Sequence, residues 1–213
     1  MQEREVTIGE HIYPLVDRDK GKFFFVLATQ NPIEQEGTYP LPEAQLDRFL
    51  MRIIISYPKT LEDEKNILRL HAKRLREPLE ELNSVVPTPA IVISIQDWIA
   101  QNIEVGENTL EYITFIVRNS RPEFNKDIRD LILCGASPRA GIFLMRAAKV
   151  NAALRGSSVA EPIDVDAVAF HVLNHRIILN PERVVEARVE EGSYVAQYKV
   201  AARAIEEVLK VSK

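Results

Sequence analysis

The first residues with a chemical use follow an apolar run. Phe23 to Ala28 is continuously apolar, without alternation, and it stops in Thr29-Gln30-Asn31-Pro32. Such a run is typical of a strand covered on both faces of a parallel sheet, and Pro32 prevents further ladder pairing. Ligands bind at the carboxyl ends of such strands, where Gln30 and Asn31 would lie. Asn-Pro is also a common turn opener, so the residues leave a ligand site and a turn equally open.

Arg139 is a second candidate for binding an anion. It is the second residue of a helix predicted to begin at Pro138, with Ser137 as its N-cap. The positive end of the helix dipole disfavours a cation there, so we expect an anion to compensate it. Free backbone N–H groups and a guanidinium together suit a phosphate. Asp127 or Asp130 from the preceding loop could equally pair with this arginine.

Arg48 is a third candidate. Phosphoryl transfer spreads charge over the γ-phosphate oxygens, and an arginine delivered there is worth roughly 10³ to 10⁵ in rate in GTPases. An arginine beside Asp47 could instead form a plain surface ion pair. From the residues alone, the ion pair is the favoured interpretation.

Metal and redox chemistry have weak support. The single cysteine, Cys134, excludes an internal disulfide and a multi-cysteine metal site, and its apolar neighbours predict a packed residue. His171 and His175 have helical i, i+4 spacing, but the sequence between them lacks the carboxylate of the zinc-protease pattern. We therefore assign no metal ligand.

Composition narrows the class of protein. The 213 residues are 46% apolar and 7% aromatic, enough for one large or two small domains. No apolar run reaches the roughly 18 residues of a membrane span, and Met1 to Glu5 lacks signal-peptide chemistry, so we expect a cytoplasmic protein with no membrane partner. The net charge is −4 and the basic residues are scattered, which makes nucleic acid an unlikely partner.

The chain changes character near Pro58. Before it, Val6 to Val16 predicts a hairpin around Gly9-Glu10, and Ile53-Ile54-Ile55 is a second buried-strand run. After it, capping and stop signals predict helices. These are expected from Thr60 to about Leu75, Ser94 to Ile103, Thr109 to Asn119, Pro138 to Gly156, from a cap at Asp164, and within Glu190 to Lys210. The expected fold is an α/β part followed by an all-α part.

One long stretch identifies a family resemblance. Ile33 to Phe49, IEQEGTYPLPEAQLDRF, resembles the AAA+ module of MoxR-family ATPases nearly residue for residue. The resemblance covers about residues 1 to 180 and is weakest from Glu123 to Leu133. It implies the C-terminal part of a AAA+ P-loop NTPase core with parallel strands, followed by a helical lid.

The resemblance also implies roles for the three candidates. Asn31 matches sensor 1, which helps to place the attacking water near the γ-phosphate. Arg48, in Leu-Asp-Arg-Phe, matches the arginine finger that reaches a neighbouring subunit's site. Arg139, in Gly-Ala-Ser-Pro-Arg-Ala, matches sensor 2, which contacts the γ-phosphate from the lid. Asn31 and Arg48 would thus be catalytic, and Asn31 and Arg139 would contact the nucleotide.

The same resemblance suggests a domain organisation. Residues 1–58 would be the end of the ATPase core, 59–180 the lid, and 181–213 a helical extension of the lid. The Val6 to Val16 hairpin resembles the insertion before sensor 1, whose tip could touch substrate or the central pore, or could simply pack. Asn174-His175-Arg176-Ile177 resembles a second recurring lid element, which we interpret as structural.

Two nucleotide-binding motifs of the family do not occur in these residues. The phosphate-binding loop Gly-x-x-x-x-Gly-Lys-Ser/Thr is missing, since Gly21-Lys22 lacks its partner glycine and hydroxyl residue, and no apolar strand ends in Asp-Glu. Met1 resembles an internal residue of the family pattern. ATP and Mg²⁺ would be held mainly by residues outside the chain. We expect it to show no ATPase activity alone, and to oligomerise or aggregate through exposed sheet edges.

The resemblance implies an ATPase that forms a ring, a hexamer when full length, and acts as a chaperone, often with a von Willebrand factor A domain partner. Two alternatives remain open. The chain could be a non-catalytic interaction module. It could also be a DNA-acting AAA+ relative with the same hairpin and arginine finger, although the pI of about 5.7 disfavours this.

Overall fold

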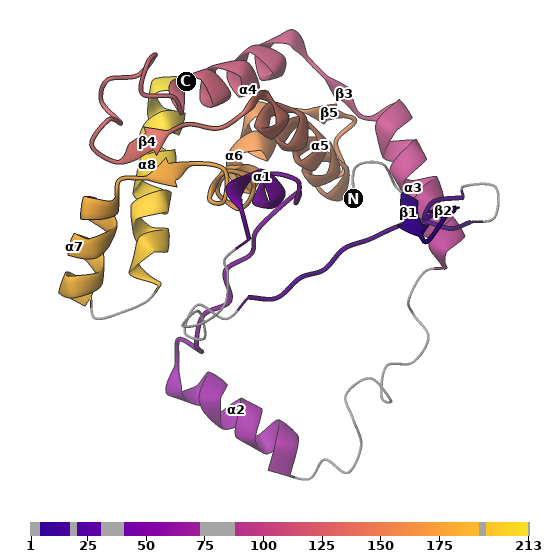
Figure 1. The fold of residues 1–213 in the computed structure, drawn as a ribbon, viewed down its shortest axis with the longest axis horizontal. Helices are drawn as coiled ribbons and strands as arrows, with labels where there is room; N and C mark the ends of the chain where they lie inside the picture. Colours follow the sequence, from indigo (N-terminus) through magenta and orange to yellow (C-terminus); the bar gives the residue numbers. More distant parts are fainter. Residues whose placement is uncertain (1–4, 18–20, 31–40, 73–87, 192–194, 213) are drawn as a thin grey trace.

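Buried side chains are concentrated in the second half of the chain. The computed structural model describes residues 5–17, 21–30, 41–72, 88–191 and 195–212. Within these ranges, every residue of the hydrophobic core lies between Ile93 and Val208. Figure 1 shows a packed group of helices with the earlier segments extending away from it.

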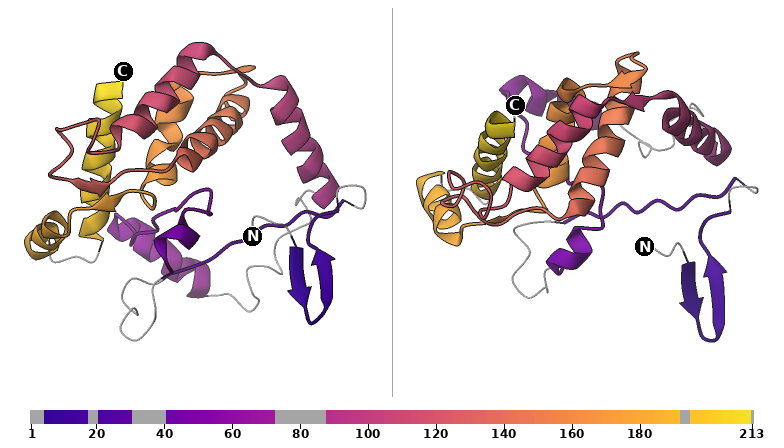
Figure 2. Two further views of the ribbon diagram at one scale, coloured as in Figure 1. Left: turned by 45° about the horizontal axis from the view of Figure 1, so that its top comes forward. Right: turned by 90° about the horizontal axis from the view of Figure 1, so that it is seen from above.

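The hairpin predicted near the start of the chain is confirmed. β1 (Glu5–Ile8) pairs antiparallel with β2 (His11–Pro14), with Ile8 opposite His11 at the tight end. Gly9 takes a φ of 63°, which suits glycine in such a turn. Figure 2 shows the hairpin standing apart from the helices, and its apolar side chains are exposed.

The two runs expected to be buried strands are not strands here. Residues 23–30 and 51–57 are extended, but they form no ladder with the described residues. Leu27 is 81% exposed and Ile55 90% exposed. A strand buried on both faces needs neighbouring strands and covering helices, and the described part of the chain places neither against these runs.

Two helices precede the packed group. α1 (Glu43–Leu46) is a single turn, and α2 (Leu61–Ala72) has no buried residue. Thr60 caps α2 as predicted, because its hydroxyl oxygen accepts from the Asp63 N–H at 3.1 Å and its O–H reaches the Asp63 carboxylate at 2.7 Å. The expected end at Leu75 lies outside the described residues.

Four helices form the core of the packed group, seen around α5 in Figure 1. They are α4 (Glu107–Asn119), α5 (Pro138–Leu154), α6 (Pro162–Leu173) and α8 (Ala196–Ser212). Apolar residues at helical spacing, such as Ile113, Ile116 and Val117 of α4, point into a shared interior. The burial of these stripes holds the four helices together.

The remaining elements surround this core. α3 (Pro89–Asn102) extends from it and buries only Ile93, and α7 (Pro181–Glu191) packs along α8. Two small sheets tie the loops together. β3 (Glu104–Val105) pairs parallel with β5 (Val159–Ala160), and β4 (Ile132–Cys134) pairs antiparallel with β6 (Ile178–Leu179).

Several predicted helix starts need correction. α3 begins at Pro89 with Thr88 as N-cap, and Ser94 lies inside it with its hydroxyl donating to the Ala90 carbonyl at 3.0 Å. Proline at the first position fixes the helix start more strongly than an internal serine does. In α6 the N-cap is Glu161, and Asp164 is its capping-box partner three residues later.

The helix expected within Glu190 to Lys210 is confirmed as α8, and α7, which precedes it, is an additional helix that the capping signals did not predict. Cys134 is exposed although its neighbours are apolar, because β4 buries Ile132 and turns Leu133 and Cys134 outward. The expectation of a packed thiol is therefore wrong.

Candidate functional site

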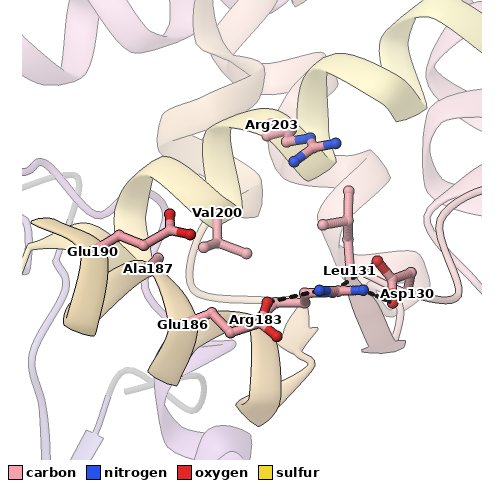
Figure 3. A pocket seen from close by; sticks show the side chains of 8 residues that line it. All are labelled: Asp130, Leu131, Arg183, Glu186, Ala187, Glu190, Val200 and Arg203. Carbon is pink, nitrogen blue, oxygen red and sulfur yellow. Dashed lines mark hydrogen bonds and ion pairs between the residues drawn. The ribbon is translucent and has the colours of Figure 1, made fainter.

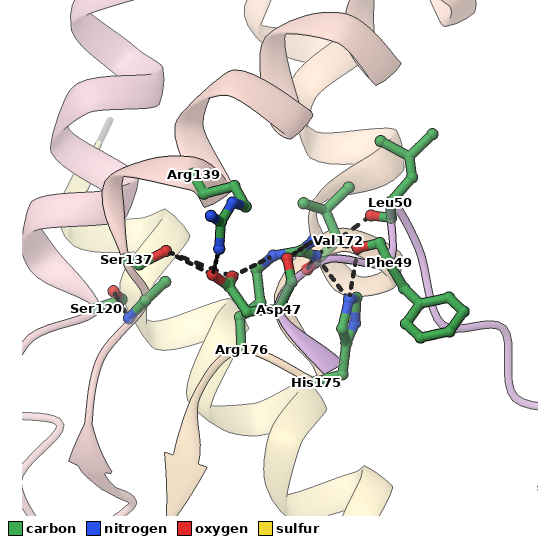
Figure 4. Close-up of polar contacts among 10 residues, drawn as sticks. Asp47, Phe49, Leu50, Ser120, Ser137, Arg139, Val172, His175 and Arg176 are labelled. Carbon is green, nitrogen blue, oxygen red and sulfur yellow. Dashed lines mark hydrogen bonds and ion pairs between the residues drawn. The ribbon is translucent and has the colours of Figure 1, made fainter. Parts of the chain in front are cut away.

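Asp47, directly after α1, joins side chains from two parts of the helical group. Its Oδ2 lies 2.5 Å from Nη1 of Arg139, and its Oδ1 lies 3.1 Å from Nε of Arg176. The Ser137 hydroxyl donates to the same carboxylate at 3.2 to 3.3 Å. Figure 4 shows these groups converging on one acid at the start of α5.

Arg139 occupies the helix-start position predicted for it. Ser137 has extended backbone angles, and its backbone carbonyl accepts a hydrogen bond from the Ala140 N–H at 3.0 Å. Its hydroxyl faces Asp47 and caps no N–H of α5. The expected anionic partner is present, since a carboxylate beside the helix N-terminus offsets both the dipole and the guanidinium. It is Asp47, and not Asp127 or Asp130. Asp130 instead pairs with Arg183, at 2.8 Å.

The loop before α5 is fixed by backbone contacts. The Ser120 hydroxyl accepts from the Ala136 N–H at 2.9 Å, and Arg121 Nε donates to the Ala136 carbonyl at 3.1 Å. Gly135 passes so close to this turn that a Cβ would lie 2.3 Å from the Ser120 carbonyl oxygen. Glycine is required there by close approach of two backbones, and this sets where α5 and Arg139 begin.

The guanidinium of Arg176 is the most buried charge at the site. Its side chain is 0% exposed, and its Nη atoms donate to the carbonyls of Asp47 at 3.0 Å and of Leu50 at 3.2 Å. It also donates to the carbonyls of Phe49 and Val172. Burial lowers the pKa of Arg176 to about 10, against the opposing effect of the Asp47 charge, so the group is cationic at neutral pH.

His175 completes the buried contact with this segment. Its Nε2 lies 3.2 Å from the Phe49 carbonyl oxygen and 2.7 Å from Nη1 of Arg176. Burial and the adjacent Arg176 charge lower the pKa of His175 to about 4. A neutral imidazole is therefore expected at physiological pH.

The next residues of the segment are held by Asn174. Its Oδ1 accepts from Arg52 Nε at 2.6 Å, and its Nδ2 donates to the Arg52 carbonyl at 3.0 Å. The Arg52 N–H also donates to the His171 carbonyl at 2.9 Å. Asp47, Phe49, Leu50 and Arg52 are thus each bonded to residues at or just after the end of α6.

Arg48 lies between Asp47 and Phe49, whose carbonyls bind Arg176, and its own side chain is exposed. Within the described ranges its guanidinium has no hydrogen-bond or ion-pair partner. The surface ion pair with Asp47 that the residues alone favoured is wrong, because the Asp47 carboxylate is taken by Arg139, Arg176 and Ser137. The remaining candidate, Asn31, lies outside the described residues, so the structure brings together only Arg139 and the segment that carries Arg48.

The fit of this site to a nucleotide is partial. Arg139 keeps a third of its side chain exposed beside a helix start without a side-chain cap, which suits an anionic phosphate. No cluster of three or more metal-ligating side chains occurs in the ranges that the structure describes. Residues for Mg²⁺ are therefore not assigned.

Asp47 and Arg176 are functional candidates that the sequence pattern does not indicate. By sequence, Asp47 is a partner for Arg48, and Asn174 to Ile177 is a structural element. Every residue has a backbone carbonyl, so the sequence does not show which carbonyls a buried arginine will bind. The adjacent Asn174, His175 and Arg176, three polar residues at a helix end, were the available hint.

A pocket of about 340 Å³ lies elsewhere, between α7 and α8 (Figure 3). Arg183 crosses it and pairs with Asp130 at 2.8 Å and Glu186 at 2.6 Å. None of the candidate residues Asn31, Arg48 and Arg139 lines this pocket, so we place the functional site at Asp47, where Arg139 meets the segment that carries Arg48. None of the helices in the described ranges is both long and apolar enough to cross a bilayer.

Two family models match the chain. Residues 1–51 match an ATPase family associated with various cellular activities (AAA), and residues 126–192 match a AAA lid domain. The first match includes Asn31 and Arg48, and the second includes Arg139 and Arg176.

Individual proteins agree with these matches. The chain is 38% identical to the uncharacterized protein YeaC of Bacillus subtilis, over 85% of this chain and 52% of that protein. It is 37% identical to the chaperone MoxR1 of Mycobacterium tuberculosis, over 84% of this chain and 45% of that protein. It thus spans about half the length of the curated relatives it matches.

A solved structure supports the fold. A putative ATPase from Cytophaga hutchinsonii matches with a TM-score of 0.75 and 37% identity, over 98% of this chain and 58% of that one. The predicted fold class, part of an α/β AAA+ core followed by a helical lid, is confirmed by these matches.

Proposed function

The chain belongs to the MoxR family of AAA+ ATPases, and on this basis we propose that it carries the residues that respond to the γ-phosphate of ATP. In this proposal Arg139 contacts the γ-phosphate from the lid, Asn31 positions the attacking water, and Arg48 enters the site of the next subunit. The proposed division of the chain is residues 1–58 as core, 59–180 as lid and 181–213 as lid extension.

The observation that carries the proposal is the ion pair between Arg139 and Asp47. It places the anion-seeking arginine of α5 one residue from Arg48, although the two come from distant parts of the chain. Arg139 keeps about a third of its side chain exposed, so an incoming anion can reach its guanidinium without unfolding the contact. A phosphate could therefore replace the Asp47 carboxylate as the partner of Arg139.

The proposed activity is that of an assembly. ATP and Mg²⁺ are the cofactors, since a AAA+ site holds a nucleotide, and both would be held mainly by motifs that these residues lack. An arginine finger acts on a neighbour's nucleotide, so the working form would be a cytoplasmic ring. Because one relative is a chaperone by name, we propose remodelling or maturation of protein complexes as the task. From the family resemblance alone we propose a von Willebrand factor A domain protein as the partner.

The test is ATP binding and hydrolysis by the chain extended upstream to include a phosphate-binding loop. Arg48→Ala should remove hydrolysis and leave ATP binding intact, whereas Arg139→Ala should weaken the preference for ATP over ADP. Arg183→Ala, which removes an exposed ion pair away from the site, is the matched control. Unchanged hydrolysis in both site variants, or robust turnover by the 213 residues alone, would refute the proposal.

A further inference from the structure

We propose that Arg176 is a positioning residue for Arg48: it holds the backbone on both sides of Arg48 and fixes where that guanidinium is presented. The inference rests on the proposed function, in which Arg48 acts on the nucleotide of a neighbouring subunit. It assigns a role in catalysis to a lid residue that need not touch the nucleotide.

Arg176 donates hydrogen bonds to backbone carbonyls on both sides of Arg48 in the sequence. One of its Nη atoms donates to the carbonyl of Asp47, at 3.0 Å, and to the carbonyl of Phe49. The other donates to the carbonyl of Leu50 at 3.2 Å, and Nε donates to the Asp47 carboxylate at 3.1 Å. The planar fork of one guanidinium therefore fixes the residues immediately before and after Arg48, as Figure 4 shows.

Arg176 is itself anchored in the rigid part of the lid. It also donates to the Val172 carbonyl at the end of α6, and its guanidinium lies 4.7 Å from the ring centre of Phe143 on α5. Val172 is fully buried in the core between these helices. A side chain locked in this way holds its partners to a narrow range of positions.

The backbone on both sides of Arg48 is held by Arg176, whereas the Arg48 side chain itself is not held. The flanking carbonyls are bonded to a buried group, whereas the Arg48 side chain is exposed and has no partner among the described residues. Removing a cation from water is unfavourable, and an apolar side chain of similar volume could join α5 to α6 without that penalty. Only a multi-donor group can bind several carbonyls at once, so this arginine is suited to holding a loop in one conformation.

As a consequence, the proposed arginine finger moves with the lid of its own subunit. Arg139 on α5 and Arg48 on the clamped segment both attach to the α5 and α6 pair. A shift of the lid that follows γ-phosphate binding at Arg139 would change the position of Arg48.

The first experiment measures the position of residue 48 directly, on the 213-residue chain. Cys134 is the only cysteine, so Cys134→Ser with Arg48→Cys and Arg146→Cys gives two spin labels, one on the segment and one on the exposed face of α5. Pulsed-EPR distances should be narrowly distributed with Arg176 present and clearly broader in Arg176→Lys. An equally narrow distribution in Arg176→Lys would overturn the inference.

Arg155→Lys is the matched control for this measurement. Arg155, at the C-terminal end of α5, also forms ion pairs, with Glu161 at 2.6 Å and with Asp164 at 2.9 Å. Neither partner belongs to the segment that carries Arg48. The label distances should stay narrow in this variant. Should Arg176→Lys fail to fold, Phe143→Leu removes the ring over the guanidinium, keeps its hydrogen bonds, and should broaden the distribution to a smaller extent.

The second experiment uses steady-state ATP hydrolysis by the upstream-extended chain. Arg176→Lys should lower kcat by about tenfold or more with KM nearly unchanged, a part of the roughly 10³ to 10⁵ that an arginine finger supplies. Because Arg176 acts through Arg48, Arg176→Lys should add no further loss in an Arg48→Ala background. A full additional loss in that background would overturn the inference.

The two experiments separate the inference from the proposed function. Hydrolysis that does not depend on Arg48 in the unsubstituted protein would refute the proposed function. The spin-label distances would then decide by themselves whether Arg176 holds the segment that carries Arg48.

Discussion

Nη1 of Arg139 lies 2.5 Å from Oδ2 of Asp47, and the two residues are 92 positions apart in the chain. The same carboxylate also binds Arg176, which clamps the backbone around Arg48. A ligand that draws Arg139 away would leave Asp47 shared only with Arg176 and Ser137. In the proposed function, binding of the γ-phosphate and placement of the arginine finger therefore meet at one acidic residue.

Asp47→Asn should destabilise the protein. The change removes the charge that compensates Arg139 and the fully buried Arg176 while keeping the shape of the side chain. Loss of a partner for a buried charge predicts a fall in the free energy of unfolding of about 1 to 3 kcal/mol, measured by urea denaturation. Asp130→Asn, at an exposed pair with Arg183, should have a much smaller effect. Equal effects of the two changes would contradict the central place of Asp47.

Stability should fall with acidification because of His175. Its pKa is lowered to about 4 in the folded state, while an unfolded histidine has a pKa of about 6.5, so below that pH the unfolded state binds a proton that the folded state does not. The contribution is fully present above pH 6.5 and is lost as the pH falls towards 4, up to about 3 kcal/mol. Denaturation midpoints measured across this range check the slope.

His175→Gln should flatten that pH dependence. Glutamine cannot titrate, so the share of the slope that belongs to residue 175 disappears even if the variant is less stable at every pH. His71→Gln, at an exposed position of α2, is the control and should leave the slope unchanged. A slope that persists in His175→Gln would show that another group causes it.

Gly135→Ala should disturb the start of α5. The added Cβ would lie 2.3 Å from the Ser120 carbonyl oxygen, so the loop must move and the bond from the Ala136 N–H to the Ser120 hydroxyl would be strained. We expect a loss of about 2 kcal/mol or more in the free energy of unfolding.

Gly141→Ala is the matched control for that change. A Cβ at Gly141 meets Val117 and Ile113 at 3.5 and 3.6 Å, which is ordinary contact, and alanine favours the helix by about 0.5 to 1 kcal/mol. This variant should be as stable as the parent or more so. Thermal unfolding of the two variants side by side tests whether space at Gly135, and not glycine in general, is what matters.

Arg48→Ala should leave folding unchanged and remove activity. Its exposed side chain has no partner in the described part of the chain, so the stability change should be within about 0.5 kcal/mol. In the upstream-extended protein, hydrolysis should fall by roughly 10³-fold or more if the guanidinium completes a neighbour's site. A large loss of stability would instead indicate a structural role for Arg48.

Local sequence signals predicted most of the helices, although not every helix start. Thr60 capping α2, Pro138 opening α5 and Gly156 with a φ of 81° following it act over a few residues, so their effect does not depend on the rest of the fold. The motifs around Arg48 and Arg139 could likewise be recognised from residue type and spacing, and they indicated the family. The buried strands were predicted wrongly, because burial depends on which neighbours cover a strand.

Only the tertiary structure decided which charges meet. Arg176 contacts Asp47 although the two residues are 129 positions apart in the sequence. The Asp47 carboxylate pairs with Arg139 and Arg176 and not with its sequence neighbour Arg48. Neither pairing has a local signature, because a guanidinium binds any carboxylate or carbonyl that the fold brings within reach, and desolvation strengthens the bonds that are buried. The sequence by itself determined the reactive groups and their helices, while packing of α5 and α6 around Arg176 determined how those groups are held together.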